Sequence, residues 1–247
     1  MDTDDTPLNR GTALPPPSDP SLLSASRRGI RSYALRAGRM TDFQRASYES
    51  LAEQWCVPFR PGEMFDPVAS FGRNAPLIIE IGFGMGLATA EIAEALPNLN
   101  FLGMEVHTPG VGKLLSEIEK RALKNVRILH HDAVEFLESC VEPNTVSGFH
   151  IFFPDPWPKK RHHKRRLIQR PLTDILASRL APGGYVYVVT DWEDYALRAR
   201  EALEATPGLR NTTPDAWAER APWRPVTKFE KRALSEGRAI RELRFEH

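Results

Sequence analysis

Short apolar runs alternate with longer amphipathic segments from residue 77 to about residue 205. Each short run predicts a buried strand, and the segments between the runs carry apolar residues at helical spacing. Strands that alternate with helices imply a parallel sheet with helices on both faces, so the pattern predicts a doubly wound α/β fold. The predicted strands are 77–81, 101–106, 126–129, 149–153 and 185–190, and the predicted helices are 87–96, 109–123, 133–139, 166–180 and 192–205.

The C-terminal residues predict an antiparallel edge to this sheet. The pieces PVTKFE (225–230) and IRELRFE (240–246) can pair as a hairpin beside the last parallel strand. A hairpin of this kind would bring Thr227 and Glu230 to the edge of the sheet where the parallel strands end.

Two segments of different composition precede the predicted sheet. Residues 1–26 include five prolines among Ser, Thr and Asp, and they carry too little apolar surface to offset the entropy of ordering, which predicts a disordered tail. Residues 27–60 form a predicted basic arm, with six arginines and one acid between 27 and 45. A solvated linker and a phosphate-binding arm are equally good interpretations of that stretch. The remaining residues, 61–247, form the predicted main domain.

Composition excludes several classes of protein. Lys and Arg number 33 against 32 Asp and Glu, and the net charge of +1 argues against a simple polybasic nucleic-acid binder. No apolar run approaches the length of a membrane span, and the acidic N-terminus does not resemble a secretory signal. The two cysteines, Cys56 and Cys140, are too few for a disulfide framework, so we expect a cytoplasmic protein that does not bind membranes.

A glycine-rich turn follows the first predicted strand. In EIGFGMG (80–86), Gly82, Gly84 and Gly86 would let the backbone approach a ligand at the start of a helix, although many α/β proteins carry such turns for packing alone. The spacing G-x-G-x-G differs from the G-x-G-x-x-G of dinucleotide binders. Glu80 at the strand end would repel a pyrophosphate and attract a cationic ligand.

Two more acids end the next two predicted strands. Glu105 lies where a carboxylate accepts hydrogen bonds from ribose hydroxyls, and Asp132 follows the third strand. One such acid is more often a helix N-cap, but three at successive strand ends converge on the crevice where doubly wound sheets bind ligands. A ligand with a ribose, a base and a positive charge fits this set, and S-adenosylmethionine is such a ligand.

The fourth predicted strand leads into the loop FPDPWP (153–158). Its prolines stiffen a segment that carries Asp155 and Trp157, a carboxylate and a flat ring suited to holding a planar heterocycle. A purely structural proline-rich turn is the alternative, and it does not require the aspartate. Thr190-Asp191-Trp192 at the end of the fifth strand repeats the pairing of an acid with an aromatic residue.

A basic run, KKRHHKRR (159–166), follows that loop directly. Residues 156–173 contain seven Lys or Arg and no acid, which the near-neutral total charge conceals. Such runs are usually solvated, but this one lies beside the predicted site, so binding of a polyanion is the better interpretation. The two histidines lack the spacing of metal ligands, and we predict no metal.

The motifs together resemble one known family. EIGFGMG, FLGMEVHTPGVG, HDA, FFPDPWPKKRHHKRRL, TDW and RPVTKFE occur in the order typical of bacterial tRNA (guanine-N7)-methyltransferases, from about Arg31 to the end of the chain. The resemblance implies a Rossmann-like class I methyltransferase fold over residues 61–247. It also implies methyl transfer from S-adenosylmethionine to N7 of guanosine 46 in the variable loop of tRNA. The proline-rich tail lies outside the resemblance.

The resemblance also implies roles for individual residues. Asp155 matches the residue that the family uses in catalysis, and Arg165 matches an arginine important for activity. The cofactor-binding set is Glu80, Gly82, Gly84, Gly86, Glu105, Asp132, Ala133 and Asp155. The substrate-binding set is Lys159, Arg165, Asp191, Thr227, Lys228, Phe229 and Glu230.

The predicted reaction needs positioning more than proton transfer. Guanine N7 has a lone pair and no proton, so carboxylates would orient the base and stabilise its developing positive charge. Trp157 or Trp192 would stack on the base. We expect tRNA as the partner, with no obligatory protein partner and a monomer or homodimer. A methyltransferase for another RNA or small molecule, an RNA-binding protein without catalysis, and more remotely a nicotinamide oxidoreductase are the alternatives.

Overall fold

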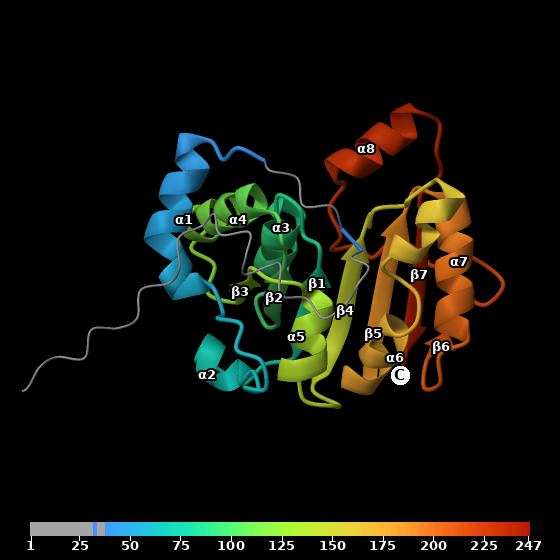
Figure 1. Cartoon of the computed structure of the whole chain (residues 1–247), viewed down its shortest axis with the longest axis horizontal. Helices are drawn as coiled ribbons and strands as arrows, with labels where there is room; N and C mark the ends of the chain where they lie inside the picture. Colours follow the sequence, from blue (N-terminus) through green and yellow to red (C-terminus); the bar gives the residue numbers. More distant parts are fainter. Residues whose placement is uncertain (1–31, 34–37) are drawn as a thin grey trace, which may run out of the picture.

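The computed structural model describes residues 32–33 and 38–247 (Figure 1). The predicted disordered tail, 1–26, and the first arginines of the predicted basic arm lie outside the described residues. The second half of that arm forms α1 (Asp42–Trp55) and packs against α4 (Thr108–Lys120). Within 32–33 and 38–247, no helix has both the length and the apolar content that crossing a membrane requires.

A mixed sheet of seven strands runs through the centre of the described molecule, in the order β3-β2-β1-β4-β5-β7-β6. The first five strands in the chain are mutually parallel, whereas β7 is antiparallel to both β5 and β6. The chain order reverses between β1 and β4, the place where doubly wound sheets bind ligands. The strands are β1 (Leu77–Ile81), β2 (Asn100–Met104), β3 (Val126–Leu129), β4 (Val146–Phe152), β5 (Leu180–Thr190), β6 (Arg210–Asn211) and β7 (Arg241–Glu246).

Helices cover both faces of the sheet and bury two apolar layers. Ile92, Leu114 and Ile118 belong to the layer under α1, α3 and α4, and Leu137 and Leu203 belong to the layer under α5, α6 and α7 (Figure 1). The parallel sheet and its antiparallel edge therefore confirm the predicted fold. The remaining helices are α2 (Pro67–Phe71), α3 (Leu87–Ala95), α5 (Ala133–Cys140), the 3-10 helix η1 (Lys160–Arg165), α6 (Leu172–Arg179), α7 (Glu193–Glu204) and α8 (Lys228–Ser235).

The predicted C-terminal hairpin is wrong in its first half. IRELRFE supplies β7 as expected, but PVTKFE forms a loop and the first turn of α8. Thr227 is the N-cap of that helix, and the Glu230 backbone N–H donates to Thr227 Oγ1 at 3.1 Å. The spacing T-x-x-E is a helix-start signature, so a local cap rather than a strand pairing determines the structure of this segment.

The region around the basic run also differs from its prediction. The single helix predicted over 166–180 is replaced by η1 before it and the shorter α6 within it. Strand β5 begins at Leu180, ahead of the Pro182-Gly183-Gly184 turn that was expected to precede it. The register of β4 and β5 shifts between Val146 and Gly148, and this irregularity lets β5 continue through the turn.

Candidate cofactor and substrate site

A cavity of about 600 Å³ lies at the carboxyl ends of the central strands. It lies beside the switch point between β1 and β4, where the fold predicts a ligand. Five segments with Ser32 and Tyr33 supply most of its lining: 80–88 at the end of β1, 104–106 at the end of β2, 131–134 at the start of α5, 152–155 at the end of β4, and 225–229 with Lys231 around the start of α8.

The glycine turn after β1 adopts a backbone that side chains disfavour. Gly82, Gly84 and Gly86 have φ of +78°, +61° and +71°, all in the left-handed region. A Cβ on Gly86 would also lie 2.6 Å from Leu114 Cβ, so helix α4 leaves no room for a side chain there. All three glycines line the cavity and let a ligand approach the backbone, as the sequence predicts.

Glu80 is a buried acid of the cavity. Its side chain projects from β1, the residue is 4% exposed, and none of the described residues hydrogen-bonds its Oε2. Burial, with a smaller contribution from the charge of Glu105, raises its pKa from 4.5 to about 7. A buried, unpaired carboxylate oxygen at a ligand cavity fits a positively charged or hydrogen-bond-donating ligand group.

Glu105 shapes the glycine turn from the neighbouring strand. Its Oε2 accepts from the Gly84 N–H at 2.7 Å, and its Oε1 accepts from the N–H groups of Val106 and His107 at 2.8 and 3.0 Å. Burial nevertheless raises the pKa of this carboxyl. Because each carboxylate oxygen accepts more than one hydrogen bond, Glu105 can both hold the turn and bind a ribose.

Asp132 caps helix α5 and lines the cavity at the same time. Its Oδ1 accepts from the N–H groups of Val134 and Glu135 at 2.8 and 3.2 Å, which is the N-cap role that the sequence left open. Ala133 follows it into the cavity lining. The cap fixes the carboxylate beside the ligand space, so the two interpretations of Asp132 are compatible.

These features fit S-adenosylmethionine. The cavity has room for a nucleoside, its glycine turn admits close approach, and its acids can meet both the ribose and the positive charges of the cofactor. Among the described residues, no group of three or more His, Cys, Asp or Glu side chains is arranged to hold a metal ion.

Asp155 lies at the mouth of the cavity in an exposed loop. Among residues of the described chain, none hydrogen-bonds its carboxylate, so both oxygens are available to a substrate. The flanking residues Phe153 and Trp157 have φ of +49° and +45°, an uncommon backbone conformation for bulky side chains. Strained backbone of this kind is concentrated at functional sites, and here it aims the loop that carries Asp155.

Thr227, Lys228 and Phe229 line the cavity at the start of α8. Phe229 is 51% exposed and lies parallel to the ring of Phe153, with centroids 6.1 Å apart. The two tryptophans proposed for base stacking are already covered. Trp157 lies under the Arg165 guanidinium at 4.3 Å, and Trp192 packs against the core.

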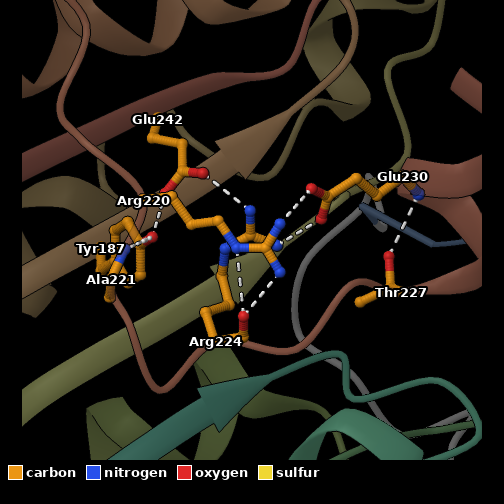
Figure 2. Close-up of polar contacts among 7 residues, drawn as sticks. All are labelled: Tyr187, Arg220, Ala221, Arg224, Thr227, Glu230 and Glu242. Atoms are coloured by element: carbon orange, nitrogen blue, oxygen red, sulfur yellow. Dashed lines mark hydrogen bonds and ion pairs between the residues drawn. The ribbon is translucent and has the colours of Figure 1, made fainter. Parts of the chain in front are cut away.

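Asp191 and Glu230 lie outside the cavity lining, contrary to the expectation that both acids face it. Glu230 is 4% exposed, and its two oxygens accept from Arg220 and Arg224 at 2.9 and 2.7 Å (Figure 2). Its side chain therefore cannot contact a base in this arrangement, which corrects the predicted substrate role. Asp191 pairs with Arg238 through Oδ2 at 2.8 Å, and its Oδ1 has no partner among the described residues.

The basic run divides into two parts. Lys159, Lys160, Arg161 and Lys164 are exposed and make no ion pair with a described residue. Arg166, in contrast, is buried and pairs with Asp194 at 2.5 Å. The predicted polyanion surface is therefore shorter than the run in the sequence.

Arg165 lies between these two parts. Its side chain covers Trp157 and donates to the Tyr33 carbonyl at 3.4 Å, while the Trp157 Nε1–H donates to the Ser32 carbonyl at 3.0 Å. These contacts join Ser32 and Tyr33 to the loop that bears Asp155.

Arg224 and Glu242, which hold Glu230 in place, were not predicted from the sequence. Arg224 is completely buried and connects Glu230 with Glu242 of β7, at 2.7 Å to each. Glu242, Arg244 and Glu246 alternate with Leu243 and Phe245 along β7, so the sequence pattern places Glu242 on the polar side of the strand. Its burial follows from tertiary contacts, with the Arg224 guanidinium and with the Tyr187 hydroxyl of β5.

Comparison with known proteins agrees with this site. A family model described as "Putative methyltransferase" matches residues 74–243. A tRNA (guanine-N(7)-)-methyltransferase from Bordetella pertussis is 53% identical over 87% of this chain and 84% of its own length. Enzymes of the same name from Treponema pallidum (strain Nichols) and Thiobacillus denitrificans are 46% and 51% identical, over 90% and 87% of this chain and 97% and 94% of their own.

Solved structures show the same fold at low sequence identity. An antibiotic-related methyltransferase superposes with a TM-score of 0.54 at 18% identity, over 76% of this chain and 99% of its own. The 16S rRNA methyltransferase KamB gives 0.50 at 18% identity, over 78% and 98%. The fold is thus the Rossmann-like class I methyltransferase fold. The extent and identity of the sequence matches show that the chain belongs to the tRNA (guanine-N(7)-)-methyltransferase family.

Proposed function

We propose that the protein transfers a methyl group from S-adenosylmethionine to N7 of guanosine 46 in the variable loop of tRNA. The observation that carries the proposal is the unpaired carboxylate of Asp155 at the mouth of the cavity, four residues before the exposed basic run. The Asp155 carboxylate is suited to a purine base, and the exposed basic run that follows it is suited to RNA phosphates. The names of the relatives support methylation of guanine N7 in tRNA, without giving the position.

The carboxylates inside the cavity would hold the cofactor. Glu80 would meet a positively charged group, Glu105 would accept from the ribose, and Asp132 with Ala133 would border the base. The backbone of Gly82, Gly84 and Gly86 would lie directly against the cofactor, because no side chain stands between them. When bound, S-adenosylmethionine supplies a methyl group attached to a sulfonium centre.

Asp155 would orient the guanine and stabilise its charge. Because N7 carries a lone pair and no proton, the protein needs no general base at this atom. The Asp155 carboxylate can accept from N1–H and the exocyclic amino group, and it favours the positive charge that the ring acquires on methylation. Asp191 would supply a second acceptor through Oδ1, which no described residue engages.

Segment 227–229 would form the rest of the base site. Thr227 and Lys228 would contact the nucleotide, and Phe229, the exposed aromatic residue of the cavity rim, would stack on the base. Stacking of this kind contributes about 1–3 kcal/mol per base. The base must leave its place in the tRNA to reach the cavity.

The exposed cations would bind the tRNA backbone. Lys159, Lys160, Arg161 and Lys164 form a positive surface beside the mouth, and Arg165 would extend it. Contacts to phosphates supply affinity and orientation without reading sequence. A tRNA substrate also accords with a cytoplasmic enzyme.

Product mapping tests the proposal. The purified protein is incubated with methyl-labelled S-adenosylmethionine and an unmodified tRNA transcript, and the product is digested and analysed by nucleoside mass spectrometry. We expect N7-methylguanosine at position 46. Absence of N7-methylguanosine, or label in another RNA or a small molecule instead, would contradict the proposal and favour a different acceptor for the same fold.

A further inference from the structure

Two arginines and two glutamates form a network of ion pairs beside the start of α8, in which Arg224, Glu230 and Glu242 are buried and Arg220 is exposed (Figure 2). The Arg224 guanidinium donates to Glu230 Oε2 and to Glu242 Oε1, each at 2.7 Å. Arg220 donates to Glu230 Oε1 at 2.9 Å and to the Arg224 carbonyl at 2.7 Å. The Tyr187 hydroxyl donates to Glu242 Oε2. The network therefore joins α8 to the two strands β5 and β7.

Helix α8 has little apolar attachment of its own. Its buried residues are Glu230 and Ala233, while Phe229 and Leu234 are 51% and 56% exposed. A single buried alanine cannot fix a helix of this length against the sheet, since apolar burial is roughly proportional to the area removed from water. The ion network thus provides a large part of the attachment of α8 to the domain.

Within residues 225–231, some side chains line the cavity and one attaches the segment to the sheet. Residues 225–229 and Lys231 line the cavity, whereas Glu230 does not and points into the network. Figure 2 shows Glu230 and Thr227 next to each other at the start of α8, with Glu230 turned toward Arg224. Movement of Glu230 would carry both neighbouring cavity residues with it.

We propose that Arg224 is a positioning residue that fixes the cavity wall 225–231 by linking Glu230 of α8 to Glu242 of β7. The consequence of this inference, the placement of guanine, rests on the proposed function. The connection from Glu230 through Arg224 to Glu242 does not depend on the substrate. Arg224 is suited to the task because a guanidinium presents separate N–H groups to two carboxylates. A lysine has one ammonium and cannot reproduce this geometry.

Two variants and a matched control test the link. Arg224→Lys keeps the charge and loses the bridging geometry, and Glu242→Gln keeps the shape and loses one charge far from the cavity lining. The control is Glu246→Gln on the same strand, which removes an exposed pair with Arg210 of β6. Hydrogen exchange of the free protein is measured by segment, and steady-state kinetics are measured with tRNA.

We expect both variants to increase amide exchange in 228–235 by about tenfold, with β1, β4 and the control unchanged. With tRNA, we expect kcat to fall about tenfold while KM stays within about threefold, because the phosphate contacts lie elsewhere. Exchange in 228–235 equal to the control, or an increase spread equally over β1 and β4, would overturn the inference. The exchange measurement contains no tRNA, so it tests the link independently of the reaction. If the proposed function is wrong, the wild-type protein will be inactive on tRNA, while the variants still show faster exchange in 228–235 than wild type.

Discussion

Glu80 and Asp155 are carboxylates of one cavity in opposite environments. Glu80 is buried in β1, and burial raises its pKa to about 7, whereas Asp155 is exposed at the rim. Enzymes assign different tasks to similar side chains by this kind of contrast. The deep carboxylate suits a permanent ligand charge, and the exposed one suits a substrate that enters and leaves.

Replacement of Asp155 with Asn should separate catalysis from folding. Asn has nearly the same shape but no charge, so we expect kcat for tRNA methylation to fall at least about a hundredfold. The thermal midpoint should stay within about 2 °C, because no described residue pairs with this side chain. Steady-state kinetics and calorimetric unfolding check both expectations, and an Asn variant with more than a tenth of wild-type kcat would contradict the assignment.

The raised pKa of Glu80 predicts a pH-dependent stability of the free protein. Between pH 4.5 and about 7 the folded state holds a proton on Glu80 that the unfolded state has released. The free energy of unfolding therefore falls as pH rises through this window, by up to roughly 3 kcal/mol, and is constant above it.

Glu80→Gln removes this proton and serves as the reference. Urea unfolding of both proteins is measured at pH 5 and pH 8 without cofactor. We expect the stability of wild type relative to the variant to be greater at pH 5 than at pH 8. Glu105, whose pKa burial also raises, is present in both proteins and so largely cancels from the difference. Equal differences at the two pH values would show that Glu80 titrates normally.

Site residues at the ends of parallel strands could be predicted from the sequence. Residues whose position depends on ion pairs between distant segments could not. Glu80, Glu105 and Asp132 lie at the cavity because parallel strands bring their carboxyl ends to one edge. Glu230 is also an acid in a predicted site motif, but the buried Arg224 and the exposed Arg220 engage its two carboxylate oxygens. Its partner Arg224 lies in an irregular segment, where no periodicity indicates which side is buried.

At the scale of elements, the sequence specifies the parallel strands more strongly than it specifies helices α1 and α8. Continuous apolar runs predicted β1 to β4 closely because strands buried on both faces exclude polar residues. Helices α1 and α8 were missed, although Thr41 and Thr227 both begin a T-x-x-E/Q cap. Both helices were missed because they are mostly polar, and α8 buries only Glu230 and Ala233.

Helix η1 gives the element-scale prediction. Replacement of Lys160, Arg161 and Lys164 with Ala removes three exposed cations that pair with no described acid. We expect weaker tRNA binding and a slope of log K against log[salt] that is shallower by about 2, at roughly 0.7–0.9 per lost phosphate contact. Filter binding at several salt concentrations measures the slope.

The control for this experiment is a cation at the other end of the sheet, because Arg210 pairs with Glu246, which pairs with Tyr185 rather than with the carboxyl end of β5. Arg210→Ala removes a 74% exposed arginine of β6, which we do not place near the tRNA. Its salt slope should equal that of wild type. An unchanged slope in the triple variant, or an equal change in both variants, would show that η1 does not bind the tRNA backbone.

At the scale of the whole molecule, the net charge of +1 conceals a separation of charge. Acids gather in the cavity, where a positive cofactor and a positively charged product are expected, and exposed cations gather beside its mouth. The cavity wall at the start of α8 is fixed by a network in which two arginines, Arg220 and Arg224, balance two glutamates, Glu230 and Glu242. A near-neutral total is therefore compatible with RNA binding, which net charge alone seemed to disfavour.

The proposed reaction places a methyl group on N7 of the guanine at position 46. The most direct test compares two tRNAs that differ only at that atom, one with guanosine and one with 7-deazaguanosine at position 46, where C–H replaces N7. We expect methyl transfer to the first tRNA and none to the second, with equal affinity for both, because the phosphate contacts are unchanged. Equal methylation of the two tRNAs would contradict the account.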